Sequence, residues 1–189
     1  MADGESGLQV INASDPALPF ILGSHDTAGT AYAVKVAGNF AYVADGPGGL
    51  RILNITNPAA ITQIGQYSAA ADARNVKIVG NIAYVAGGTN GLLLLNIANP
   101  AAPVLIGSYT VAGTVLDVEV IGDIAILAKG ANGLETVNVA NPSAITQMGV
   151  NITLTNATSL RVQGSTLGVA DGIRGLKIFQ IVGVTIGVP

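Results

Sequence analysis

Apolar residues along the chain fall in short runs, separated by glycine, asparagine, aspartate and proline. Between residues 31 and 68 the runs are 33–36, 40–44, 50–54 and 61–65. Each run spans about 4–6 residues, and none keeps an apolar face at helical spacing, so the pattern predicts β-strands, here named A, B, C and D. Gly38 followed by Asn39 predicts a tight A–B hairpin. Asn57-Pro58 predicts the end of strand C, because proline has no amide hydrogen to donate to a sheet.

The same pattern returns every 42 residues without insertion or deletion. The clearest landmark is a Gly-Leu pair that begins at Gly7, Gly49, Gly91, Gly133 and Gly175. A period of about 40–45 residues is typical of one four-stranded propeller blade. Strands A to C carry apolar residues on both faces, and a sheet of this kind buries both faces only against neighbouring repeats. We therefore predict an all-β fold, a single β-propeller domain over residues 1–189 with four 42-residue four-stranded blades in WD-like strand order.

The residues of one repeat also resemble a known family. Tyr42-Val43-Ala44-Asp45-Gly46, then Gly49-Leu50 and Asn57-Pro58, are similar to the LVIVD-repeat β-propeller family. The resemblance extends over residues 3–181. It implies a propeller and, in general, a surface or extracellular role, and it implies no catalytic residues.

The strands at the two ends of the chain allow more than one way to close the ring. Residues 2–8 align with 44–50, so the chain opens with strands C and D and closes with A, B and C at about 158–181. Strand C therefore occurs five times, near 8, 50, 92, 134 and 176, and each other strand four times. Three arrangements fit this count. One is a four-bladed ring closed by pairing of the N- and C-terminal strands, and another is a ring of about eight blades made by two chains. The third is a short piece of a longer propeller that stacks with its copies. We favour four blades per chain.

The composition argues against several classes of binding partner. Half the residues are hydrophobic, only 10% are charged, the net charge is −3 and cysteine is absent. The chain has no basic patch for nucleic acid or an anionic membrane, and its apolar runs are far below the roughly 18 residues of a membrane span. The N-terminus has no signal-peptide pattern. We expect no nucleic-acid partner and no membrane insertion; the location stays unknown, with the extracellular space, a cell surface or a virion favoured.

Candidate chemistry is sparse. His25 is the single histidine, and the aspartates that recur in the B–C turn, Asp3, Asp45 and Asp171, match the needs of the turn itself. We expect no metal, no cofactor and no enzymatic activity. One strand A position carries Lys35, Lys77, Glu119 and Arg161, which predicts a ring of salt-bridged or rim-exposed groups.

The D–A and B–C loops are expected on one face of the ring. Nine residues of these loops are our candidate binding residues: His25, Asp26, Asp45, Tyr67, Asp72, Arg74, Tyr109, Asp171 and Arg174. Tyrosine and arginine are common interface anchors, although such residues can also simply keep a rim soluble. The sequence favours a non-enzymatic scaffold that binds a protein partner or itself. A glycan-binding propeller is the alternative, and a hydrolase or metal enzyme at the channel mouth is the third candidate.

Overall fold

The structure, a computed structural model, describes residues 1–70, 72–151 and 153–182. A first hairpin comprises β1 (Leu8–Asn12) and β2 (Phe20–His25). Three four-stranded sheets follow: β3 (Ala33–Ala37), β4 (Phe40–Ala44), β5 (Leu50–Asn54) and β6 (Thr62–Tyr67); β7 (Asn75–Val79), β8 (Ile82–Ala86), β9 (Leu92–Asn96) and β10 (Val104–Tyr109); β11 (Asp117–Ile121), β12 (Ile124–Ala128), β13 (Leu134–Asn138) and β14 (Thr146–Asn151). The last sheet comprises β15 (Ala157–Gln163), β16 (Thr166–Asp171) and β17 (Leu176–Gln180). Two short 3-10 turns are Pro142–Ala144 and Gly172–Arg174.

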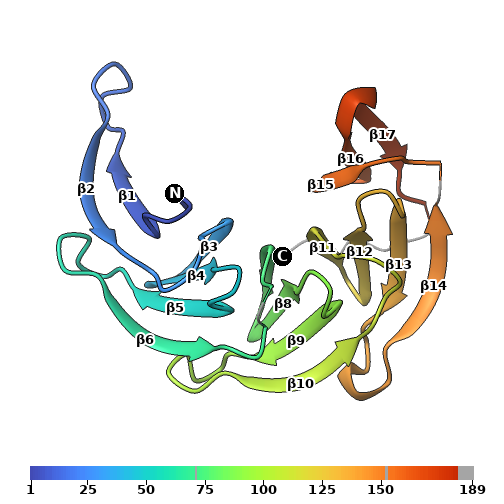
Figure 1. Cartoon of the computed structure of the whole chain (residues 1–189), viewed down its shortest axis with the longest axis horizontal. Helices are drawn as coiled ribbons and strands as arrows, with labels where there is room; N and C mark the ends of the chain where they lie inside the picture. The colour runs from blue at the N-terminus through green and yellow to red at the C-terminus, as the bar shows by residue number, and fades with distance from the viewer. Residues whose placement is uncertain (71, 152, 183–189) are drawn as a thin grey trace.

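The sheets are arranged around a hub as the blades of a β-propeller (Figure 1). Within each sheet consecutive strands pair antiparallel, and the first strands β3, β7, β11 and β15 contact one another in series at the hub. Strands β6, β10 and β14 lie at the outer rim. The predicted all-β propeller of antiparallel four-stranded blades, with repeats of about 42 residues, is confirmed. We refer to β3–β6, β7–β10 and β11–β14 as the first, second and third blades.

Each blade buries both of its faces because alternate residues of a strand point to opposite sides. On the first blade Tyr42 and Ile52 face the second blade, where they belong to the same core cluster as Val76 and Val85. Val43 faces the opposite way, in a cluster that includes Leu8 of the first hairpin. Burying one such side chain contributes about 1.5–3 kcal/mol. The core is therefore a series of layers between blades, as the repeat predicts.

The glycines of strand D are required by close packing of the backbone. A side-chain carbon added at Gly65 would collide with the carbonyl oxygen of Pro100, in the C–D turn of the next blade. Gly107 has the same relationship with Pro142. The recurring glycine and the recurring Asx-Pro turn are thus two halves of one contact between neighbouring blades.

The B–C turn of each blade hydrogen-bonds to the D–A loop that leads into the next. Gly46 N donates to Ala73 O at 3.0 Å, and Ala73 N donates to Gly46 O at 3.1 Å. Gly88 pairs in the same way with Val115, and Gly130 with Ala157. The two kinds of loop therefore lie on one face of the ring, as predicted.

The ring does not close in this structure. Strand β1 pairs with β2, and its Leu8 also forms a bridge with Ala2 near the start of the chain. Strand β17 pairs only with β16 among the described residues. The hairpin and the last sheet stand at opposite ends of an open arc (Figure 1). The closure by pairing of the terminal strands that the sequence allowed is not observed, because the packing between successive blades fixes a curvature that keeps the two ends apart. The strands of the fourth blade are divided between these two ends.

Candidate binding face

Asp45 is fully buried at the end of β4 and organises the first blade. Thr27 Oγ1 donates to its Oδ1 at 2.5 Å, and Arg51 Nε donates to its Oδ2 at 3.3 Å. Arg51 in turn donates to the side-chain oxygen of Gln66 on β6. The carboxylate joins a D–A loop, strand C and, through Arg51, strand D, so this candidate residue serves the fold and is not free for a ligand.

Asp171 holds the same position in the last sheet and is also buried. Its Oδ1 accepts hydrogen bonds from the backbone N of Thr155 at 2.9 Å and of Asn156 at 2.8 Å. Its Oδ2 is buried and has no hydrogen-bond partner among the described residues. Arg174 is exposed nearby and donates to Thr153 O at 3.5 Å.

Asp72 and Arg74 form a pair of their own in the second blade. The distance from Arg74 Nε to Asp72 Oδ1 is 2.5 Å, and the Arg74 guanidinium lies 4.7 Å from the centre of the exposed Tyr32 ring. Both charged side chains are partly exposed, so the ion pair is worth at most about 1 kcal/mol. The cluster connects the first two blades at the surface.

Tyr109 contacts an ion pair that the sequence did not reveal as a unit. Its hydroxyl donates to Glu135 Oε1 at 2.7 Å, and Lys129 Nζ donates to Glu135 Oε2 at 2.6 Å. Burial, together with the hydrogen bond to the Glu135 carboxylate and its negative charge, raises the pKa of Tyr109 to about 12. The available signal was the spacing of Lys129 and Glu135, which equals that of Asp45 and Arg51.

The remaining candidates stand apart. His25 is half-buried at the end of β2, opposite Leu8, and Asp26 beside it is exposed. Tyr67 packs against the core between the first and second blades. The nine predicted residues thus lie in separate clusters, one or two per blade, and do not converge on one pocket.

The charged position of strand A, which carries Lys35, Lys77, Glu119 and Arg161, forms the predicted salt bridge in one pair. Lys77 Nζ lies 2.6 Å from Glu119 Oε2 on the next blade. Two residues before Glu119, the buried Asp117 accepts from Ser159 Oγ at 3.1 Å and from Leu160 N at 2.7 Å. Burial raises the pKa of Asp117, although these hydrogen bonds act in the opposite direction. Both carboxylates connect neighbouring blades.

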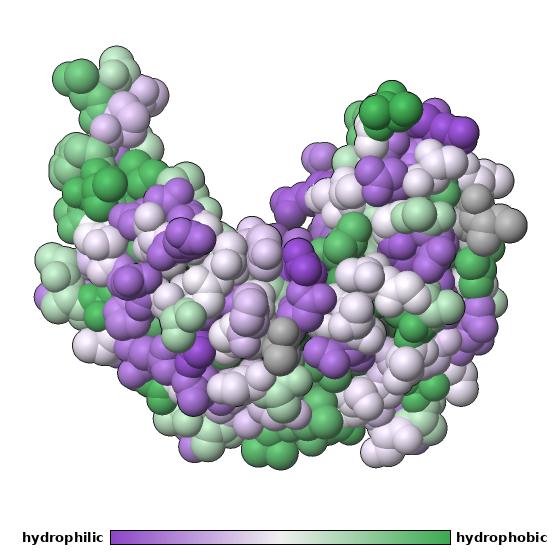
Figure 2. Space-filling model, viewed as in Figure 1, coloured by the Kyte–Doolittle hydropathy of each residue, from purple (hydrophilic) through white to green (hydrophobic). Residues whose placement is uncertain are grey.

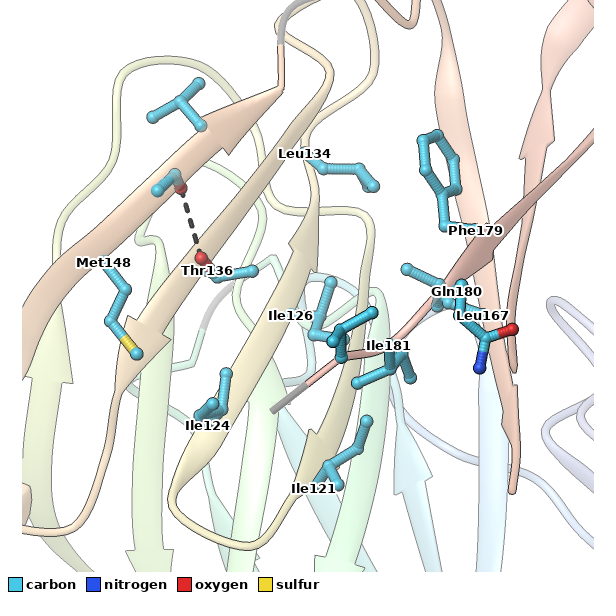
Figure 3. A pocket seen from close by; sticks show the side chains of 13 residues that line it. Ile121, Ile124, Ile126, Leu134, Thr136, Met148, Leu167, Phe179, Gln180 and Ile181 are labelled. Carbon is cyan, nitrogen blue, oxygen red and sulfur yellow. Dashed lines mark hydrogen bonds between the residues drawn. The ribbon is translucent and has the colours of Figure 1, made fainter. Parts of the chain in front are cut away.

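A cavity of about 370 Å³ lies between the third blade and the last sheet (Figure 3). It is lined almost wholly by apolar side chains, among them Met148 and Phe179. Ile126 and Thr136 stand where the first blade has Tyr42 and Ile52, and these smaller side chains leave the space unfilled. Thr136 Oγ1 donates to Gly149 O at 3.4 Å, and no charged side chain lines the cavity.

Among the described residues no group of three His, Cys, Asp or Glu side chains is placed to hold a metal ion. The helical turns of the described chain include none that is long and apolar enough to cross a membrane.

These features define a β-propeller built from identical-length repeats. The LVIVD repeat model matches residues 1–27, 28–69, 70–111 and 112–153, and the chain belongs to the LVIVD-repeat family. Residues 154–182 lie outside that match but continue the same strand order as β15–β17.

Two designed proteins of known structure share the fold. The computationally designed Ika8 protein superposes with a TM-score of 0.65 at 9% identity, over 85% of this chain and 49% of that chain. The computationally designed Ika4 protein gives a TM-score of 0.62 at 10% identity, over 85% of this chain and 95% of that one. This chain thus spans about half the length of the first and nearly all of the second. No curated protein matches the sequence.

Proposed function

We propose that this chain is a non-enzymatic scaffold that associates with a protein partner or with other copies of itself through the open ends of its arc. One observation carries this proposal: apolar side chains that the middle blades bury are exposed at the two ends. Leu176 and Ile178 on β17 are 70% and 61% exposed, whereas Leu50 and Ile52, at the same repeat positions, are 0% exposed. An exposed apolar surface of this kind is typical of an interaction site.

The other end shows the same contrast. Val36 on β3 is 61% exposed, while Val120, at the same position of the third blade, is 9% exposed. Val36 faces the place where the inner two strands of a preceding blade would lie, and the first hairpin supplies only the outer two. Figure 2 shows the two arms of the arc rising on either side of an open notch.

The use of the polar groups supports a structural role as well. Asp45, Asp117 and Glu135 are buried, and each is engaged by hydrogen bonds or ion pairs within or between blades. A general acid or base needs access to a substrate. These buried carboxylates therefore support a rigid framework, which suits a protein that presents surfaces.

Sedimentation of two matched variants tests the proposal. Val36→Asp places a charge on the uncovered end, and Val104→Asp places one on the outer rim, where Val104 is 59% exposed. We expect the wild-type chain to sediment with a mass above 18.8 kDa at micromolar concentrations. Val36→Asp should raise the dissociation constant at least about tenfold, because an interfacial charge must be desolvated, and Val104→Asp should leave it unchanged. A wild-type chain that stays at 18.8 kDa up to millimolar concentration would refute self-association.

A further inference from the structure

We propose that the partner is a second copy of this chain, and that hairpin β1–β2 of one copy joins strands β15 and β16 of the other to make a complete four-stranded blade. In this exchange β17 is displaced by β1. The inference rests on the proposed function and specifies its partner. Two copies would form one ring, with three complete blades from each chain and two composite blades at the junctions.

The strand types at the two ends complement each other. Hairpin β1–β2 consists of strands C and D, and β15 and β16 are strands A and B. In the first blade strand B pairs with strand C through Ala44↔Leu50 and Phe40↔Asn54. The repeat places Ala170 and Thr166 of one copy opposite Leu8 and Asn12 of the other in the same register.

The free edge of β1 already accepts a strand in this manner. Gln9 N donates to Met1 O at 2.9 Å, and the amino group of Met1 donates to Gln9 O at 2.6 Å. Met1 and Ala2 are thus paired with β1 where the end of a strand B belongs. In the composite blade Val169 and Ala170 of β16 would take these places and continue the pairing along the whole of β1.

The faces complement each other as well. Beside β1 lies an apolar hollow of about 290 Å³, lined by side chains that include Val34, Val36 and Ala41. Strands A and B of a preceding blade would cover this hollow, as β7 and β8 contact β11 of the third blade. At the other end of the arc, Ala170 of β16 is exposed, whereas Ala44 at the same repeat position is fully buried.

Strands β1 and β17 are both C strands and would compete for one place in the composite blade. The burial of their side chains indicates that β17 is the one displaced. Leu8 of β1 is 2% exposed and packs in the core of the first blade, whereas Leu176 of β17 is 70% exposed. In the first blade the buried aspartate is held by Arg51, but Lys177, at the same position of β17, is exposed and forms no ion pair with Asp171 among the described residues. Gln9 of β1 would bring an amide donor to this place, beside the unpaired Oδ2 of Asp171.

The arc explains why the second end belongs to another copy. The hub strands β3, β7, β11 and β15 are in contact one after the next, and the hairpin and last sheet stand far apart across the opening (Figure 1). Closing this gap within one chain would require the packing between blades to change. A second copy fills the gap with the contacts between blades left as they are.

Engineered cysteines test the exchange directly, because the natural chain contains none. Asn12→Cys with Thr166→Cys, both half-buried, should form disulfides between two copies, which appear as a species of twice 18.8 kDa on a non-reducing gel. Each single-cysteine variant is the control and should give no such species at the same protein concentration. In a second double variant, Thr166→Cys with Gln180→Cys, the two residues are paired in the open arc, so an intrachain disulfide reports that β17 is still in place.

The expected result is efficient crosslinking of the first variant and at least about tenfold slower intrachain oxidation of the second in assembled protein. An intrachain disulfide in the first variant would mean that the chain closes on itself and would overturn the proposal. Fast intrachain oxidation of the second variant in protein that still associates would also overturn it, and would leave the proposed scaffold function standing. Failure of the wild type to associate with itself at all would overturn the exchange and would leave a different protein as the partner of the scaffold.

Discussion

Lys129 and Glu135 form a buried ion pair at the two repeat positions that Asp45 and Arg51 hold two blades earlier, with the charges exchanged. Lys129 Nζ lies 2.6 Å from Glu135 Oε2, and Arg51 Nε lies 3.3 Å from Asp45 Oδ2. The second blade has Gly87 and Leu93 at these positions, so within the three complete blades the two charges are present together or absent together. In the first and third blades the buried site therefore holds a complete ion pair of either polarity, as expected for charges taken out of water.

The first prediction concerns this pair. Glu135→Gln leaves the Lys129 ammonium buried without a counter-charge, which should lower the free energy of unfolding by about 3–5 kcal/mol in urea titrations. The double variant Lys129→Asp with Glu135→Arg places the charges as in the first blade and should recover a large part of the loss. If the double variant is as unstable as Glu135→Gln, the two sites are not equivalent.

The Tyr109 hydroxyl provides a second test. Its pKa is raised to about 12 by burial and by the Glu135 carboxylate. Because the folded pKa is above the usual 10, this group stabilises the fold below pH 10 and the contribution is lost as the pH rises toward 12. Absorbance titration at about 295 nm, with Tyr109→Phe as the difference reference, should show one late phenol that shifts toward 10 in Glu135→Gln. An unchanged titration in Glu135→Gln would contradict the contact.

The third prediction follows from Asp117, whose pKa burial raises above its usual value. A carboxyl group with a raised folded pKa favours the fold most when protonated, so its contribution is present at acid pH and declines as the pH rises through the folded pKa. The stability advantage of the wild type over D117N should therefore grow as the pH falls from 7 toward about 4. Urea unfolding of both proteins across this range measures the difference, and a shrinking advantage would show that the hydrogen bonds to Leu160 and Ser159 outweigh burial.

The fourth prediction compares two glycines at one repeat position. Gly65→Ala forces a side-chain carbon onto the carbonyl oxygen of Pro100, and the resulting backbone shift should cost about 1–3 kcal/mol. At Gly149 the added carbon would meet only Thr136 Oγ1, at 3.3 Å, and this side chain can move. We expect Gly149→Ala to cost less than about 1 kcal/mol by thermal or urea unfolding. Equal losses would mean that the contact between strand D and the next C–D turn is not what requires glycine.

Much of the architecture follows from the sequence because the blade is a local unit. Strand B at Phe40–Ala44 and strand C at Leu50–Asn54 were predicted at their observed bounds, and the shared face of the B–C and D–A loops was also predicted. The period fixes which strands pair within a blade. It does not fix the angle between blades, which depends on the packing of many side chains.

The site was less predictable for the same reason. Asp45 and Asp171 were expected to serve their own B–C turns, whereas their carboxylates accept hydrogen bonds from the D–A loop that precedes their sheet. The Lys129–Glu135 pair was not predicted, because the sequence shows Lys129 only as a replacement for the aspartate of the first blade. The three-dimensional contact shows that Glu135 replaces the arginine partner at the same time. The cavity beside Ile126 and Thr136 arises from two smaller side chains whose effect depends on what packs opposite them.

The most direct test of the open arc as an assembly unit is the mass of the intact chain under native conditions. Native mass spectrometry at low micromolar concentration should show a dominant species of twice 18.8 kDa, the mass of a ring with two composite blades. A spectrum that contains only the 18.8 kDa species at every concentration would contradict the account, since the apolar ends would then remain bare in solution.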